Sequence, residues 1–168
     1  EIIIELLDGE GALLSRITSQ RRDTLAWHPF TKIIDMPPLT RQAKITWASH
    51  RKSHNGKGND AGFDDLYLGF ETIDTPHSLL SGNLLSIPGV EDGAASAWDM
   101  DGFMVLEDLR PYGLSFYHPW TYSGEYHFYG GGLIELEGGK EGLSTLSQSI
   151  DMTSFASLLA QQKVALRW

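Results

Sequence analysis

Residues 2–17 read IIIELLDGEGALLSRI, and this stretch decides the fold class that we expect. Apolar runs at 2–7 and 12–17 flank the glycine-rich segment 8–11. Two short apolar runs joined by a turn that contains Gly and Asp are typical of a β-hairpin. The sequence therefore predicts that the chain begins with two antiparallel strands.

Strand patterns continue through much of the chain. Short apolar or alternating runs predict further strands at 25–27, 30–34, 43–49, 66–73, 103–106, 113–118, 125–129 and 133–137. The segment 74–102 is the least regular part of the sequence. Its Asp-Met-Asp-Gly at 99–102 is interpreted as an acidic turn before a strand.

One helix is predicted near the C-terminal end. Asp151 is suited to cap a helix whose apolar face carries Met152, Phe155, Leu158 and Leu159. The alternation that follows predicts a final strand that begins at Val164.

About nine or ten short strands with one late helix predict a mainly β fold, either a β-sandwich or a β-barrel. The 168 residues, of which 41% are hydrophobic, suffice to bury a core without a metal or a disulfide. We therefore expect residues 1–168 to form a single β-rich domain. The absence of cysteine excludes disulfides, cysteine-ligated metal sites and a thiol nucleophile. No apolar run approaches the roughly 18 residues of a membrane-spanning helix, so no membrane span is predicted.

The net charge of −9 is distributed unevenly along the chain. Residues 16–57, which we call the basic segment, contain nine Lys and Arg residues and two acids. The flanks at 1–15 and 58–168 are both net acidic. The basic segment supplies five candidate partner-binding residues, Arg41, Lys44, Arg51, Lys52 and Lys57.

Three interpretations of this charge contrast stay open. Basic and acidic strands can neutralise one another within one fold. A dipolar surface can instead steer association with another copy, giving a homo-oligomer or a larger assembly. The basic segment can also bind nucleic acid, with stacking on Trp27, His28, Phe30 and Trp47. The acidic majority of the chain, with a pI near 5.0, disfavours nucleic acid because it repels phosphates.

Aromatic residues are concentrated between residues 112 and 129, which hold eight of the 18 aromatic side chains. Because successive strand residues point to opposite faces, one face can present rings to a carbohydrate-like ligand or a subunit. The candidate ligand-binding residues are Trp120, Tyr122, Tyr126 and Phe128. The alternative, in which these rings form a core with ordinary cross-strand pairs, also stays open.

The same region contains three candidate metal ligands, His118, Glu125 and His127. The spacing from His118 through Glu125 to Gly132 resembles the first metal-binding motif of cupins. That resemblance implies a small β-barrel that holds a divalent metal. The sequence departs from the motif because Trp120 stands at the second His position, and no later His supplies a second motif.

These patterns predict a non-catalytic binding or assembly module that uses an aromatic sheet face and the basic segment. The alternative is a small β-barrel metal-dependent enzyme with a cupin-like site in the 113–132 hairpin. A second alternative is nucleic-acid binding through the basic segment.

Overall fold

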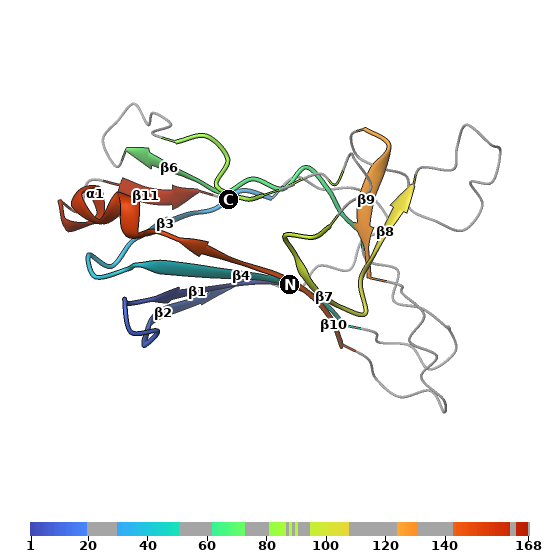
Figure 1. Ribbon diagram of the computed structural model, residues 1–168, viewed down its shortest axis with the longest axis horizontal. Coiled ribbons are helices and arrows are strands. Elements are labelled where there is room, and N and C mark those ends of the chain that lie inside the picture. The colour runs from blue at the N-terminus through green and yellow to red at the C-terminus, as the bar shows by residue number, and fades with distance from the viewer. Residues whose placement is uncertain are drawn as a thin grey trace. The chain divides into compact units, whose positions relative to one another are not determined.

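The computed structural model describes residues 1–19, 30–50, 62–72, 81–86, 88, 90, 95–107, 124–130, 143–161 and 164–167. These residues form antiparallel β-sheets with one short α-helix near the C-terminal end, so the mainly β prediction is confirmed (Figure 1). They divide into two compact units, and each unit is considered by itself. The first comprises Glu1–Thr46, Tyr67–Ser86 and Gln148–Trp168, and the second comprises Trp47–Leu66 and Ile87–Ser147.

The strands divide between these units. The first unit contains β1 (Ile2–Leu7), β2 (Leu13–Thr18), β3 (Ile33–Asp35), β6 (Gly69–Thr72) and β11 (Val164–Arg167). The second contains β5 (Gly62–Phe63), β7 (Asp99–Asp101), β8 (Met104–Glu107) and β9 (Tyr126–Tyr129). Two longer strands, β4 (Gln42–His50) and β10 (Leu143–Asp151), contribute residues to both units.

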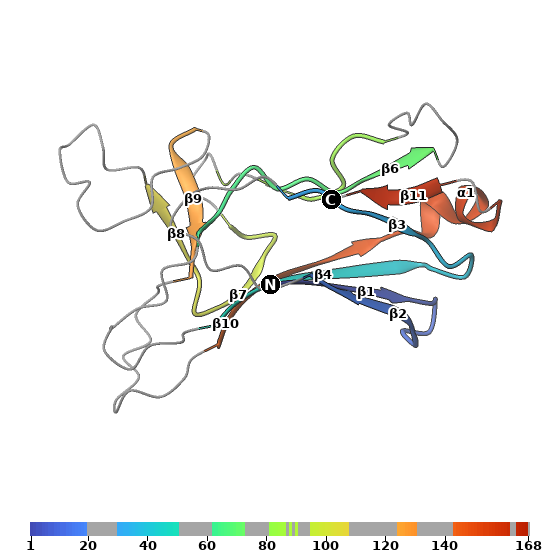
Figure 2. The ribbon, with the colours of Figure 1, turned by 180° about the vertical axis from the view of Figure 1, so that it is seen from behind.

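The first unit has two layers, seen from opposite sides in Figures 1 and 2. One layer has the strand order β2-β1-β4-β10, and the other has the order β3-β11-β6. Alternate residues of β1 and of the start of β4 are buried, as expected for a sheet that packs one face against a core. In the other layer, consecutive residues of β6 such as Phe70 and Glu71 are buried. The buried apolar side chains are Ile4, Leu6 and Ile45 in one layer, and Ile34, Phe70 and Leu166 in the other.

The predicted N-terminal hairpin is present as β1 and β2. The strands pair antiparallel, with Ile4 opposite Ile17. Asp8 Oδ1 accepts hydrogen bonds from the backbone N–H groups of Glu10 at 2.9 Å and Ala12 at 2.8 Å. Gly11 has φ +84°, a conformation that glycine adopts without steric cost. The turn is therefore fixed by the Asp and Gly residues that predicted it.

The sequence predicts that Asp151 caps the C-terminal helix, but Met152 holds the N-cap position of its first turn, and no side chain caps that turn. Asp151 Oδ1 accepts a hydrogen bond from the Thr153 N–H at 2.8 Å. The helix starts as a 3₁₀ turn, η2 (Thr153–Phe155), and continues as α1 (Ala156–Ala160). Phe155 packs against Phe70 with ring centroids 4.7 Å apart, which attaches the helix to the first unit.

Three of the described strands, β5, β7 and β10, were not predicted from the sequence. The segment 99–101 is not an acidic turn but β7, which pairs with β10 and sets Met100 opposite Leu146. β10 itself is nine residues long, and its Ser144, Ser147 and Gln148 are buried. Hydrogen bonding compensates for this burial; Ser144 Oγ, for example, donates to the Gly130 carbonyl at 3.1 Å.

The second unit contains the sheet β5-β9-β8 in addition to β7 and its neighbours. Each sheet formed by the described residues has two edge strands, so none of them closes into a barrel. The strands predicted at 25–27, 113–118 and 133–137 lie outside the described residues.

Candidate functional site

A cluster of aromatic rings forms the interior of the second unit. Trp98 lies between Trp47 and Phe128, with ring centroids 5.2 Å from each and interplanar angles of 68° and 65°. Phe63 lies 6.5 Å from Trp47 and 5.8 Å from Phe103. Edge-to-face and tilted pairs at these separations are stabilising beyond the area they bury. The described rings of this cluster therefore act as core.

The cluster also requires close backbone approach at Gly130. A Cβ at this position would lie 3.2 Å from both the Phe103 ring and the Ser49 side chain. A larger residue would have to displace one of them. Trp47 is only 2% exposed, so it does not provide the exposed stacking surface that nucleic-acid binding would use.

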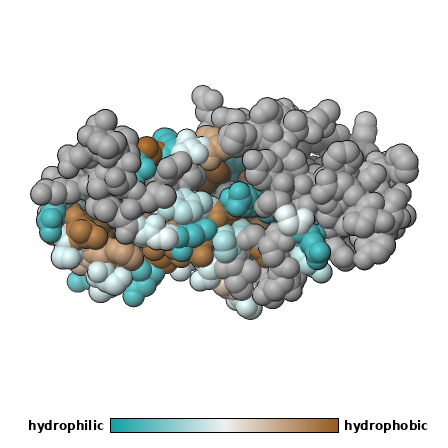
Figure 3. Space-filling model, turned by 90° about the horizontal axis from the view of Figure 1, so that it is seen from above, coloured by the Kyte–Doolittle hydropathy of each residue, from teal (hydrophilic) through white to brown (hydrophobic). Residues whose placement is uncertain are grey.

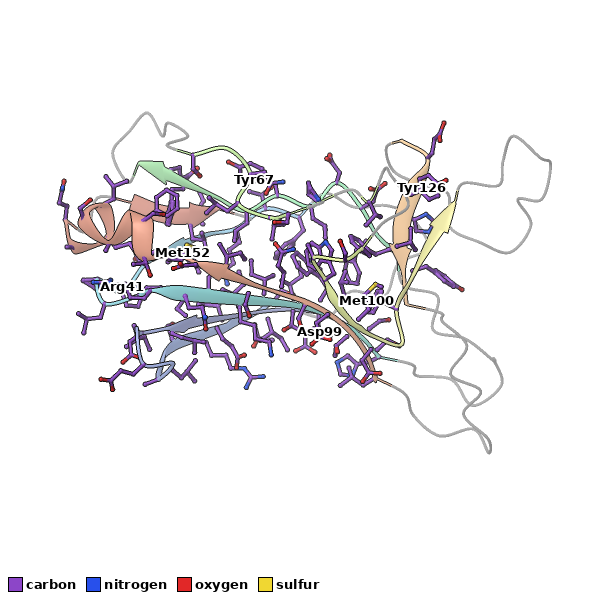
Figure 4. The ribbon with its side chains drawn as sticks, viewed as in Figure 1. Arg41, Tyr67, Asp99, Met100, Tyr126 and Met152 are labelled. Carbon is purple, nitrogen blue, oxygen red and sulfur yellow. The ribbon has the colours of Figure 1, made fainter. Side chains whose placement is uncertain are left out.

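The predicted ligand-binding residues Tyr126 and Phe128 share one face of β9. Phe128 is fully buried against Trp98, whereas Tyr126 at the start of the strand is half-buried. Figure 4 labels Tyr126 on this strand. Trp120 and Tyr122 lie outside the described residues. Of the two described candidates, only Tyr126 is thus partly exposed to solvent.

The predicted metal ligands occupy different environments. Glu125 is exposed and precedes β9, whereas His127 is 1% exposed and lies edge-to-face against Tyr129 at 6.4 Å. His118 lies outside the described residues. Within the part of the chain that the structure describes, no three His, Asp or Glu side chains are grouped so that they could hold a metal ion.

Two of the five predicted basic residues are described, and both belong to the first unit. Arg41 Nη1 donates hydrogen bonds to the carbonyl oxygens of Pro38 at 3.1 Å and Thr40 at 2.7 Å. The guanidinium of Arg41 thus stabilises the turn that precedes β4 (Figure 4). Lys44 is half-buried on β4. Arg51, Lys52 and Lys57 lie outside the described residues.

Lys44 belongs to what we call the outer face, the side of the β2-β1-β4-β10 layer that points away from the core of the first unit. Along β4, the side chains of Ala43 and Ile45 are buried. The side chains of Lys44 and Thr46, which alternate with them, are half-buried. The same alternation sets Glu5 of β1 and Arg16 of β2 on the outer face. The outer-face residues are Ile3, Glu5, Arg16, Thr18, Gln42, Lys44, Thr46, Ser149 and Asp151.

Charges of both signs are neighbours on the outer face. Arg16 lies directly opposite Glu5 in the strand register, and Arg16 Nη1 is 3.7 Å from Glu5 Oε1. Hydrogen bonds from Thr153, through its side chain first and its backbone second, lower the pKa of the exposed Asp151 carboxyl. This carboxylate therefore remains charged in mildly acidic solution.

No local pattern in the sequence groups the outer-face charges, because they come from distant parts of the chain. These charges are Arg16, Glu5, Lys44 and Asp151. On the face that Figure 3 shows, hydrophilic and hydrophobic residues are interspersed among the described residues. Comparison with protein-family models, curated proteins and solved structures found no match to this chain. No helix among the described residues has the length and apolar character needed to cross a membrane.

Proposed function

We propose that this protein is a non-catalytic binding or assembly module that engages its partner through charged surface on a β-sheet. The observation that carries the proposal is the outer face, where Lys44 and Arg16 lie beside Glu5 and Asp151 on four neighbouring strands. Sheet strands hold these side chains at fixed spacing, so the charges form a pattern that a complementary surface can match.

Assembly with other copies is the form of this function that the sequence favours. The basic segment of one copy and the acidic flanks of another attract each other at long range, which steers their encounter. Tyr126 and the predicted Trp120 and Tyr122 stay candidate contacts in the same proposal, whereas the buried Phe128 does not. The expected partner is therefore a protein surface that bears both signs of charge.

Sedimentation equilibrium at varied ionic strength tests this function. Attraction between exposed charges is screened over about 10 Å at 0.1 M salt and about 3 Å at 1 M salt. We expect a mass above the 18.7 kDa monomer at low salt and a return to monomer at high salt. A monomer at every salt and protein concentration would contradict assembly.

A further inference from the structure

The charges on the outer face alternate in sign from strand to strand. In the strand order β2-β1-β4-β10 they are Arg16, Glu5, Lys44 and Asp151. Arg16 and Asp151 are exposed, and Glu5 and Lys44 are half-buried. The face thus carries two positive and two negative strands in alternation.

These four charges also lie near the same end of the sheet. The Arg41 N–H donates to the Leu7 carbonyl at 2.9 Å, and the Met152 N–H donates to the Arg41 carbonyl at 2.8 Å. The end of β1, the start of β4 and the end of β10 are therefore adjacent. Glu5, Lys44 and Asp151 each lie within three residues of these bonded positions. Figure 4 shows Arg41 and Met152 close together at this end.

We propose that the outer face pairs with the same face of a second copy, an inference that rests on the proposed function and names its partner. The two-fold axis runs parallel to the strands, between β1 and β4. Such an axis exchanges β1 with β4 and β2 with β10. Glu5 of one copy then faces Lys44 of the other, and Arg16 faces Asp151.

This arrangement is favoured by complementarity of charge. Each of the four charged strands meets a strand of opposite sign, and no like charges face each other across the pair. Two sheets packed face to face lie about 10 Å apart, a gap that Lys and Arg side chains reaching toward carboxylates can bridge. A polyanion such as nucleic acid fits less well, because Glu5 and Asp151 repel phosphates.

Apolar surface beside the charges would be covered by the same pairing. Ile3 is half-buried on the outer face. Leu13, opposite Leu7 at the turn end of β2, is 54% exposed. Removing such side chains from water adds stabilisation that is not screened by salt. The face therefore combines a charge pattern that sets orientation with apolar area that contributes affinity.

Mixing two charge-reversed variants tests the pairing. In a pair of Lys44→Glu chains, the new Glu faces Glu5 of the other copy. In a pair of Glu5→Lys chains, the new Lys faces Lys44 of the other copy. Each variant alone therefore places two like charges against each other. We expect each to weaken self-association by about tenfold or more. An equimolar mixture restores both contacts as Glu–Lys pairs, so we expect a mixed dimer by sedimentation equilibrium.

Lys32→Glu is the matched control, because it makes the same charge change at an exposed residue outside the outer face. We expect it to associate like the unaltered protein. Circular dichroism and the unfolding midpoint verify that each variant is folded, since Glu5→Lys also removes the ion pair with Arg16. If all three variants associate as strongly as each other, and the mixture associates no more strongly than either variant alone, the proposed pairing is wrong. Assembly through another surface would then still be consistent with the data. If the unaltered protein stays monomeric, the proposed function fails as well.

Discussion

The side-chain amide of Gln148 forms two hydrogen bonds with the backbone of Ser86, 62 residues away in the chain. Its Oε1 accepts from the Ser86 N–H at 2.9 Å, and its Nε2 donates to the Ser86 carbonyl at 3.1 Å. Gln148 is 7% exposed. One amide thus satisfies both backbone groups of a loop residue and attaches that loop to β10 in the first unit.

Gln148→Leu is expected to lower the free energy of unfolding by about 1–3 kcal/mol, because two hydrogen bonds of about 0.5–1.5 kcal/mol each are lost. Urea unfolding measures the change. Gln161→Leu is the matched control, since Gln161 is exposed and its side chain has no such partner among the described residues. A loss as large in the control as in Gln148→Leu would show that this pairing is not the cause.

Gly69→Ala is expected to destabilise the first unit. A Cβ at Gly69 would overlap the Tyr67 ring, whose hydroxyl donates to the Ser81 carbonyl at 3.3 Å. Displacing that ring is expected to cost about 1–3 kcal/mol of unfolding free energy. Gly82→Ala is the control, because nothing lies within 4 Å of a Cβ there. Equal unfolding midpoints for the two variants would contradict this account.

Trp98→Ala is expected to lower the free energy of unfolding by about 3–5 kcal/mol, the usual cost of truncating a buried aromatic residue. Trp98 is 6% exposed and contacts rings on both sides. The aromatic near-ultraviolet circular dichroism should weaken at the same time. Met100→Ala on the adjacent strand is the control, since Met100 is 37% exposed and its truncation should change stability little. If Trp98→Ala is as stable as the Met100→Ala control, the aromatic cluster does not stabilise the second unit as a core.

The lowered pKa of Asp151 predicts a pH dependence of stability. The Thr153 hydrogen bonds favour the ionised carboxyl in the folded state, so its pKa lies below the unfolded value. The resulting stabilisation is complete above the unfolded pKa and is lost as the pH falls through the folded pKa. Asp151→Asn lacks this titration, so the stability difference between the two proteins should shrink on acidification. A difference that is constant from neutral pH to the acid limit of folding would contradict the prediction.

Local patterns in the sequence predicted those parts of the fold that local chemistry determines. In the first hairpin, the Asp8 side chain accepts a hydrogen bond from the backbone, and Gly11 adopts the positive φ that the turn needs. Asp151 likewise accepts a hydrogen bond from the nearby Thr153 N–H, although Met152 holds the N-cap position. Both signals lie within a few residues of the structure they determine, so the sequence was sufficient to find them.

β10 was not predicted because several of its buried side chains are polar, which interrupts the apolar pattern formed by the buried Leu146 and Ile150. Ser144 and Gln148 are buried through hydrogen bonds to Gly130 and Ser86, and these partners are distant in the sequence. An apolar pattern cannot detect burial of that kind. The outer face depends on β10, because Asp151 becomes a neighbour of Lys44 only when β10 pairs with β4. The basic segment thus predicts Lys44 as a candidate contact residue but does not indicate the charges beside it.

Pairing of two copies through the outer face is tested by acetylation of the amines of Lys44 and Lys32. The reaction rate of each amine is compared between dilute and concentrated solutions of the unaltered protein. We expect Lys44 to react several-fold more slowly in the concentrated, associated protein, because the outer face is then covered. Lys32, exposed and outside this face, should react at the same rate in both solutions. Unchanged labelling of Lys44 in an associated protein, or equal slowing of both lysines, would show that the outer face is not the interface.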